Sequence, residues 1–135
     1  MKKLLSTKYN AGAFNTGLLI LRLGAGILMA NHGYSKLVGF NDMSTKFVNF
    51  LGLGSDVTLA LVIFAELFCA AFIVIGLFTR LACIPLIISC TYAVAIAHKW
   101  DVFDTGELAA LFLAAFLTLL FTGPGRISID KMISK

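Results

Sequence analysis

Four long apolar stretches, separated by short polar segments, run through the chain and cover about residues 15–36, 56–78, 81–97 and 107–122. A bilayer hydrocarbon core takes roughly 20 apolar residues for each helical crossing, and each stretch is close to that length. The pattern therefore predicts four transmembrane helices. We expect an all-α polytopic membrane protein, an antiparallel four-helix bundle that forms a single domain over residues 1–135.

The segment between the first two crossings predicts one further element. It mixes apolar and polar residues, and from Met43 onward the apolar residues recur at helical spacing. A helix over about residues 42–52 is too short to span a bilayer. We expect it to lie along the membrane surface as a short interfacial helix.

The composition agrees with a membrane protein. Hydrophobic residues make up 59% of the chain, charged residues only 13%, and the mean hydropathy is +0.94, well above what a soluble domain with a wet surface carries. The net charge of +4 is compatible with nucleic-acid binding, but the basic residues lie at helix ends rather than along one exposed stripe. We therefore expect the lipid bilayer, and not nucleic acid, as a partner.

The basic residues outside the apolar stretches are distributed unequally between the two sides of the predicted bundle. Three lie on one side: Lys36, Lys46 and Lys99. Seven lie on the other: Lys2, Lys3, Lys8, Arg80, Arg126, Lys131 and Lys135. Because cytoplasmic loops carry the excess of Lys and Arg, we expect both termini in the cytoplasm.

Ionisable side chains inside the apolar stretches indicate a site. Arg22, His32 and Lys36 belong to the first stretch and Glu66 to the second. A charged group near the bilayer centre costs several kcal/mol, so each of these groups needs a partner, a water-filled cavity or a function. At about 100° per residue, the three residues of the first helix fall within an arc of roughly 80° and share one face.

Helical rise brings further polar groups to a similar depth. At 1.5 Å per residue, His32 lies about 6 Å and Glu66 about 13 Å below the outer boundary, and Arg22 approaches Glu66 from below. His98 and Glu107 lie at that boundary. We therefore expect a polar pocket open to the outer face, with candidate catalytic residues His32, Glu66 and Glu107 and candidate binding residues Arg22, Lys36 and His98.

Structural roles for these residues are the alternative. Arg22 and Glu66 as a buried ion pair would only fix the register of two helices. Lys36 would extend to the lipid head groups, and His98 would anchor the chain at the interface. His32 is harder to explain in this way, because an ordinary transmembrane helix has an apolar residue at such a position; we expect it to bind a ligand or to handle protons.

Metal chemistry has little support in the sequence. The two histidines belong to separate predicted helices, and neither HExxH nor CxxCH nor a cluster of carboxylates is present. We predict no metal site. Haem bound by the two histidines is a less favoured candidate for the cofactor.

The order and spacing of these residues resemble a known family. The pattern consists of Arg22-Leu-Gly, His32-Gly-x-x-Lys36-Leu, Glu66, Gly76-Leu-Phe-Thr-Arg80, Glu107, and Gly123-Pro-Gly125 with Asp130. From Gly17 to Asp130 the chain is similar to the DoxX family of bacterial four-helix membrane proteins. The resemblance implies an antiparallel four-helix bundle in the bacterial cytoplasmic (inner) membrane.

The resemblance also implies an activity, because members of this family are described as quinone-linked oxidoreductase subunits. The implied cofactor is a quinone, with its head group in the pocket. His32 and either Glu66 or Glu107 would exchange protons with its carbonyl oxygens. Lys36 or Arg22 would stabilise the developing anion.

No redox centre is visible in the sequence, so the electrons must come from a bound cofactor or a partner. We expect a partner membrane or redox protein, or a second copy of the chain. The alternative function is that of a non-catalytic accessory or assembly subunit of a larger membrane complex, which the apolar faces and the interfacial helix would contact.

Overall fold

The computed structural model describes all residues from 1 to 135 and contains only helices. In chain order the elements are α1 (Ala11–Val38), α2 (Phe40–Met43), α3 (Ser55–Ile63), η1 (Phe64–Cys69), α4 (Ala70–Ile75), α5 (Thr79–Tyr92), η2 (Ala93–Ala97), α6 (Glu107–Thr122) and α7 (Ile129–Ile133). The segments η1 and η2 are π-helical. Elements α3, η1 and α4 form one continuous helix, the second crossing, and α5 continues into η2 as the third crossing.

Three of these helical stretches are long and apolar enough to cross a membrane: α1 with 28 residues, the second crossing with 21 and the third with 19. Helix α6 is equally apolar but has only 16 residues. It begins and ends at the predicted residues, whereas α1 begins earlier than predicted, at Ala11. The predicted all-α bundle of apolar helices is confirmed.

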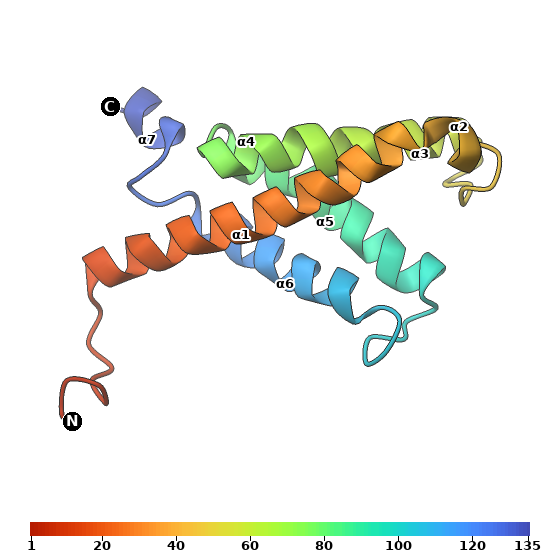
Figure 1. Ribbon diagram of the computed structural model, residues 1–135. Coiled ribbons are helices and arrows are strands. Elements are labelled where there is room, and N and C mark those ends of the chain that lie inside the picture. Colours follow the sequence, from red (N-terminus) through yellow and green to blue (C-terminus); the bar gives the residue numbers. More distant parts are fainter.

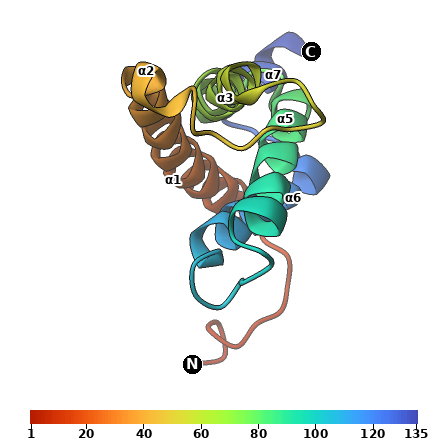
Figure 2. The ribbon, with the colours of Figure 1, turned by 90° about the vertical axis from the view of Figure 1, so that its right-hand side faces the viewer.

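The four long helices pack in a ring. Helix α1 lies against the second crossing on one side and against α6 on the other, and α5 closes the ring through contacts with the same two neighbours. Figure 1 shows α1 running obliquely across α6, with both termini at one end of the bundle. The loops that follow α1 and the third crossing lie at the opposite end, as the turned view in Figure 2 also shows.

The interior of the bundle is a small apolar core, and many larger apolar side chains face outward. Core residues include Leu18, Ile73, Leu86, Phe116 and Leu119. Exposed apolar side chains occur on every long helix, among them Ile20, Leu61, Phe68, Ile88, Leu111 and Phe121. In a bilayer this outer surface contacts lipid chains, which are as apolar as the side chains themselves.

Two glycines on one face of α1 allow close contact with the second crossing. A Cβ atom at Gly26 would lie 2.6 Å from Cγ2 of Val74, and one at Gly33 would lie 2.6 Å from the backbone nitrogen of Leu67. Small residues at helix interfaces are typical of membrane bundles because they let backbones approach closely. Gly33 therefore brings α1 against η1 at the position of Glu66.

The interfacial helix predicted over residues 42–52 is much shorter in the structure, so its predicted bounds are wrong. The structure has a single helical turn, α2, and turns and bends follow it up to α3. The side-chain oxygen of Asn49 accepts a hydrogen bond from the backbone nitrogen of Gly54 at 2.9 Å, which replaces a helical bond by a local loop. Leu51, Gly52 and Gly54 have positive φ angles of 51°, 76° and 95°, so the chain cannot continue as a helix there.

Candidate functional site

The Arg22 side chain donates four hydrogen bonds to backbone carbonyls, toward the end of the bundle where both termini lie. It is 2% exposed. Its Nε donates to the carbonyl of Ile73 at 3.0 Å and its Nη2 to the carbonyl of Val74 at 2.9 Å. Its Nη1 donates to the carbonyls of Pro124 at 2.9 Å and Ile127 at 2.6 Å. Arg22 thus joins two carbonyls at the end of α4 to the segment after α6.

A carboxylate completes this junction from the other side. The two oxygens of Asp130 accept hydrogen bonds from the backbone nitrogens of Phe78 and Thr79, at 2.6 and 2.8 Å. These nitrogens lie at the N-terminus of α5, where a negative charge is favourable. The backbone nitrogen of Asp130 donates to the carbonyl of Gly76 at 2.8 Å. We call this set, Arg22 with Asp130 and their backbone partners, the Arg22 junction.

Glu66 has different partners from those expected. It lies in η1, on the second crossing, and its Oε2 forms an ion pair with the Lys36 ammonium of α1. Ser89, on α5, donates from its hydroxyl to Oε1 at 3.3 Å. A π-helical turn inserts an extra residue and often marks a functional site, since it re-aims a side chain. The Glu66 carboxylate therefore connects three helices near the middle of the bundle.

A polar cavity of about 220 Å³ adjoins this ion pair. Its polar side chains are Lys36, Glu66, His32, His98 and Thr105. The remaining lining residues are Met29, Cys90, Ala93, Leu108, Ala109 and Phe112. The cavity therefore lies between α1, η1, the end of the third crossing and the start of α6. Below we call it the polar pocket.

The two histidines differ from Lys36 and Glu66 in having no protein hydrogen-bond partner. The ring of His32 lies with its edge against Phe112, at a centroid distance of 5.8 Å and an interplanar angle of 87°. His98 follows η2 directly, so a second π-helical segment positions a pocket residue. Both side chains are half-buried, and they line the pocket with free ring nitrogens that can donate or accept.

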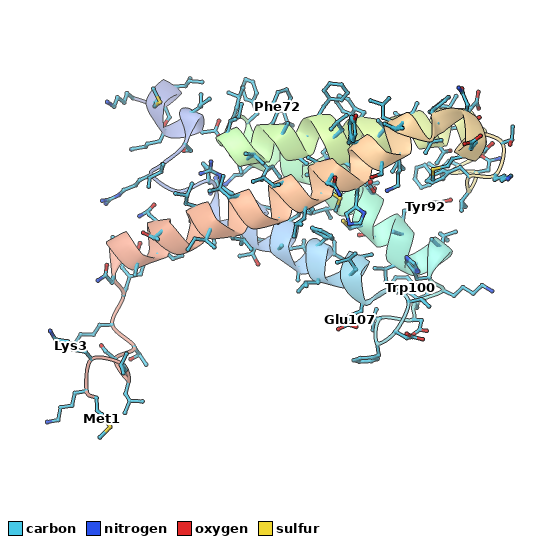
Figure 3. All side chains as sticks on the ribbon, viewed as in Figure 1. Met1, Lys3, Phe72, Tyr92, Trp100 and Glu107 are labelled. Atoms are coloured by element: carbon cyan, nitrogen blue, oxygen red, sulfur yellow. The ribbon has the colours of Figure 1, made fainter.

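Four of the six predicted site residues thus meet in one cavity: His32, Lys36, Glu66 and His98. Arg22 does not line it, and the predicted contact between Arg22 and Glu66 is wrong, because backbone carbonyls take all of the guanidinium's hydrogen bonds. Glu107 opens α6 as an exposed residue outside the cavity, toward the loop end of the bundle in Figure 3.

The alternative for Lys36 is also corrected. Its ammonium pairs with Glu66 and does not extend to the lipid head groups. The pairing places two opposite charges at the inner wall of the polar pocket, where each lowers the cost of burying the other.

Sequence reasoning missed several residues in and beside the pocket. Ser89, next to the pocket, donates a hydrogen bond to Glu66 from the third crossing, and the Phe112 ring packs against the His32 ring. Cys90, which lines the pocket, lies eight residues before His98, or about two helical turns, so its spacing from His98 was an available signal. Phe112 lies in an unbroken apolar run, and nothing in its local sequence distinguishes it from its neighbours.

The fold and the pocket together define a polytopic membrane protein with a polar, partly charged cavity inside a four-helix bundle. Comparison with known proteins identifies the group to which it belongs. The profile of the DoxX family matches residues 17–99. The chain belongs to the DoxX family.

Individual relatives agree with this assignment. The chain is 32% identical to the inner membrane protein YphA of Escherichia coli, over 84% of this chain and 88% of that protein. It is 23% identical to the uncharacterized membrane protein Rv3486 of Mycobacterium tuberculosis, over 87% and 82% of the two chains. It is 29% identical to an uncharacterized protein of Haemophilus influenzae, over 87% and 91%. No solved structure matches the chain significantly.

Proposed function

We propose that this protein is a quinone-linked oxidoreductase subunit of the bacterial inner membrane, and that its polar pocket binds the quinone head group. The observation that carries the proposal is the meeting of His32, Lys36, Glu66 and His98 in one cavity of about 220 Å³. Small-molecule sites usually measure about 300–1,000 Å³. This cavity is therefore of a size for one ring rather than for an entire lipid.

The chemistry of quinone reduction suits these side chains. A quinone takes up two electrons and two protons to become a quinol, and its two carbonyl oxygens become hydroxyls. His32 and Glu66 are the groups that exchange protons with those oxygens. Lys36, beside Glu66, stabilises the negative charge that develops on an oxygen before its proton arrives. The electrons come from a partner redox protein.

Arg22 and Glu107 have no part in this proposal. The Arg22 guanidinium has its hydrogen bonds occupied at the other end of the bundle, and Glu107 lies outside the cavity. His98 has a binding role, as a hydrogen-bond donor to the second carbonyl oxygen of the ring.

Quinone binding by the purified protein tests the proposal. We expect menaquinone or ubiquinone to co-purify and to be detected by mass spectrometry of the extracted lipid. His32→Ala and Glu66→Gln should each weaken binding of added quinone by tenfold or more, about 1.4 kcal/mol. Asn31→Ala is the matched control, because Asn31 is the exposed neighbour of His32 on α1.

Two outcomes would contradict the proposal. One is that no quinone co-purifies and none binds to the unmodified protein. The other is that the protein co-purifies at fixed stoichiometry with a larger membrane protein, that Glu66→Gln weakens only this assembly, and that quinone content is unchanged. The second result would favour an accessory subunit.

We also propose that both termini face the cytoplasm, which the distribution of Lys and Arg supports. The polar pocket then opens toward the outer side of the membrane. Carboxy-terminal fusions test this orientation: green fluorescent protein should fluoresce and alkaline phosphatase should be inactive. The opposite pair of results would reverse the topology.

A further inference from the structure

A second cavity lies next to the polar pocket, in the wall between α1 and α6. It measures about 440 Å³ and is lined by eight hydrophobic residues of nine. Leu108 and Phe112 line both cavities, so the two adjoin each other at these side chains. We call the second cavity the α1–α6 groove.

The groove is open because its walls carry small side chains. Ala25 faces it from α1, and Ala114 and Ala115 face it from α6. Ala114 is exposed, on the lipid-facing side of the bundle. Small residues at such positions either let helices close up or leave room for another molecule, and here they leave room.

We infer that the α1–α6 groove holds the isoprenoid tail of the quinone whose head group lies in the polar pocket, and that the quinone enters sideways from the bilayer between these two helices. This inference rests on the proposed function. The polar pocket is too small for a tailed quinone, so the tail must leave it. The apolar space that adjoins it at Leu108 and Phe112 has twice that volume.

Another apolar groove does not fit this role. It lies between the second and third crossings, measures about 280 Å³ and includes Phe64, Pro85 and Ile88. It shares no lining residue with the polar pocket. Ser89 and its hydrogen bond to Glu66 stand between the two, so a tail leaving the pocket on that side would have to break this contact.

Two quinones and one matched pair of variants test the inference. Menadione has the ring without a tail, and menaquinone-4 has the same ring with four isoprenoid units. Ala114→Leu fills the groove, and Ala71→Leu adds the same side chain at an exposed position of α4 outside every cavity described here. Dissociation constants are measured in the same nanodiscs, so partitioning of the tail into lipid affects all variants equally.

We expect Ala114→Leu to weaken menaquinone-4 binding by about tenfold and to leave menadione binding within about twofold. Ala71→Leu should change neither. Thr118→Leu, one turn further along the groove, should repeat the effect of Ala114→Leu if that variant is poorly folded. Thermal unfolding of each variant shows whether it is folded.

Several results would overturn the inference while leaving the polar pocket as the quinone site. One is menaquinone-4 binding that Ala114→Leu and Thr118→Leu leave unchanged, which means an ordinary lipid chain fills the groove. Another is an equal loss of menadione and menaquinone-4 binding in folded Ala114→Leu and Thr118→Leu proteins, because a groove that held only the tail would leave menadione binding unchanged. Failure of the proposed function is distinguishable, because then neither menadione nor menaquinone-4 binds the unmodified protein.

Discussion

The Arg22 junction and the polar pocket satisfy buried charges in opposite ways. At the Arg22 junction, backbone carbonyls accept every hydrogen bond that the guanidinium donates. At the polar pocket, Lys36 and Glu66 pair with each other, and the side chains of the two histidines have no hydrogen-bond partner in the protein. The first arrangement leaves nothing for a ligand to replace, and the second offers free donors and acceptors beside an ion pair.

This difference shows that burial of a charge does not by itself indicate a functional site. Arg22 is the more deeply buried of the two cations, at 2% exposure against 22% for the Lys36 side chain. It donates to carbonyls at the end of α4 and in the segment after α6, two parts of the chain that it holds together. The variants below test whether the junction holds the fold and the pocket binds the ligand.

The largest effect is expected for Arg22→Ala. It leaves the carbonyls of Val74, Pro124 and Ile127 without their donor. The Ile73 carbonyl loses one of its two donors and keeps the backbone nitrogen of Gly76. Each unsatisfied buried group costs about 1–3 kcal/mol, so we expect a loss of about 3 kcal/mol or more, or no recoverable folded protein. Thermal unfolding in detergent, together with the yield of monodisperse protein, measures this.

Arg80→Ala is the control for that variant. Arg80 is exposed and donates one long hydrogen bond, 3.4 Å, to the carbonyl of Phe121. It should change stability by about 0.5 kcal/mol. Equal unfolding temperatures for the two arginine variants would show that the Arg22 junction does not hold the fold.

Glu66→Ala should have the next largest effect on stability. It leaves the half-buried Lys36 ammonium without its partner, and we expect a cost of about 2–3 kcal/mol, somewhat less than for a fully buried pair. The double variant Lys36→Met with Glu66→Ala should recover part of this loss. A double-mutant cycle from unfolding free energies should give a coupling of about 1–2 kcal/mol; a coupling of zero would mean that the two charges act independently.

Gly33→Ala should destabilise the bundle by about 1–2 kcal/mol. The added methyl group meets the backbone of Glu66 and Leu67, which cannot move as a flexible side chain can. Because Gly33 sets the distance between α1 and η1, quinone binding should weaken as well. Gly24→Ala is the control: nothing lies within 4 Å of its added carbon, so stability should rise slightly through helix propensity. A Gly33→Ala protein that is as stable as Gly24→Ala would refute the close contact.

The smallest effect on stability is expected for His32→Gln. The ring contacts Phe112 only through its edge, and such pairs contribute about 0.5–1.5 kcal/mol. Unfolding should therefore shift by less than about 1 kcal/mol, while quinone binding falls by tenfold or more. Destabilisation comparable to that of Arg22→Ala would show that His32 supports the fold and would contradict its role in ligand binding.

The long helices were predictable because length and hydropathy suffice to identify a membrane crossing. Helix α6 begins at Glu107 and ends at Thr122 as predicted, since an acidic residue opens it and Gly123-Pro124-Gly125 stops it. The loop after α1 was not predictable in the same way. Its apolar residues have helical spacing over residues 42–52, but no helix forms there, because the Asn49 side chain accepts a local hydrogen bond from Gly54 and because Leu51 and two glycines have positive φ angles.

The candidate site was predictable only in part. Helical spacing predicted that His32 and Lys36 share one face of α1. Depth in the membrane predicted that Glu66 and His98 lie near this face, and the four side chains line one cavity. The partners of Arg22 were missed because they are backbone groups, remote in sequence, that exist only where α4 ends and where the segment after α6 returns. Gly76, which ends α4 in a left-handed conformation, was the sequence signal for the end of this helix, but it did not identify Arg22 as a partner of the last carbonyls.

The unequal lengths of α1 and α6 have a consequence for the surrounding membrane. At 1.5 Å per residue, the 28 residues of α1 measure about 42 Å and the 16 residues of α6 about 24 Å. Helix α1 is therefore longer, and α6 shorter, than the thickness of the hydrocarbon core, which is about 30 Å. Hydrophobic mismatch of this kind tilts the long helix and thins the bilayer around the short one. The bilayer is therefore expected to be thinner beside α6, the helix that forms one wall of the α1–α6 groove.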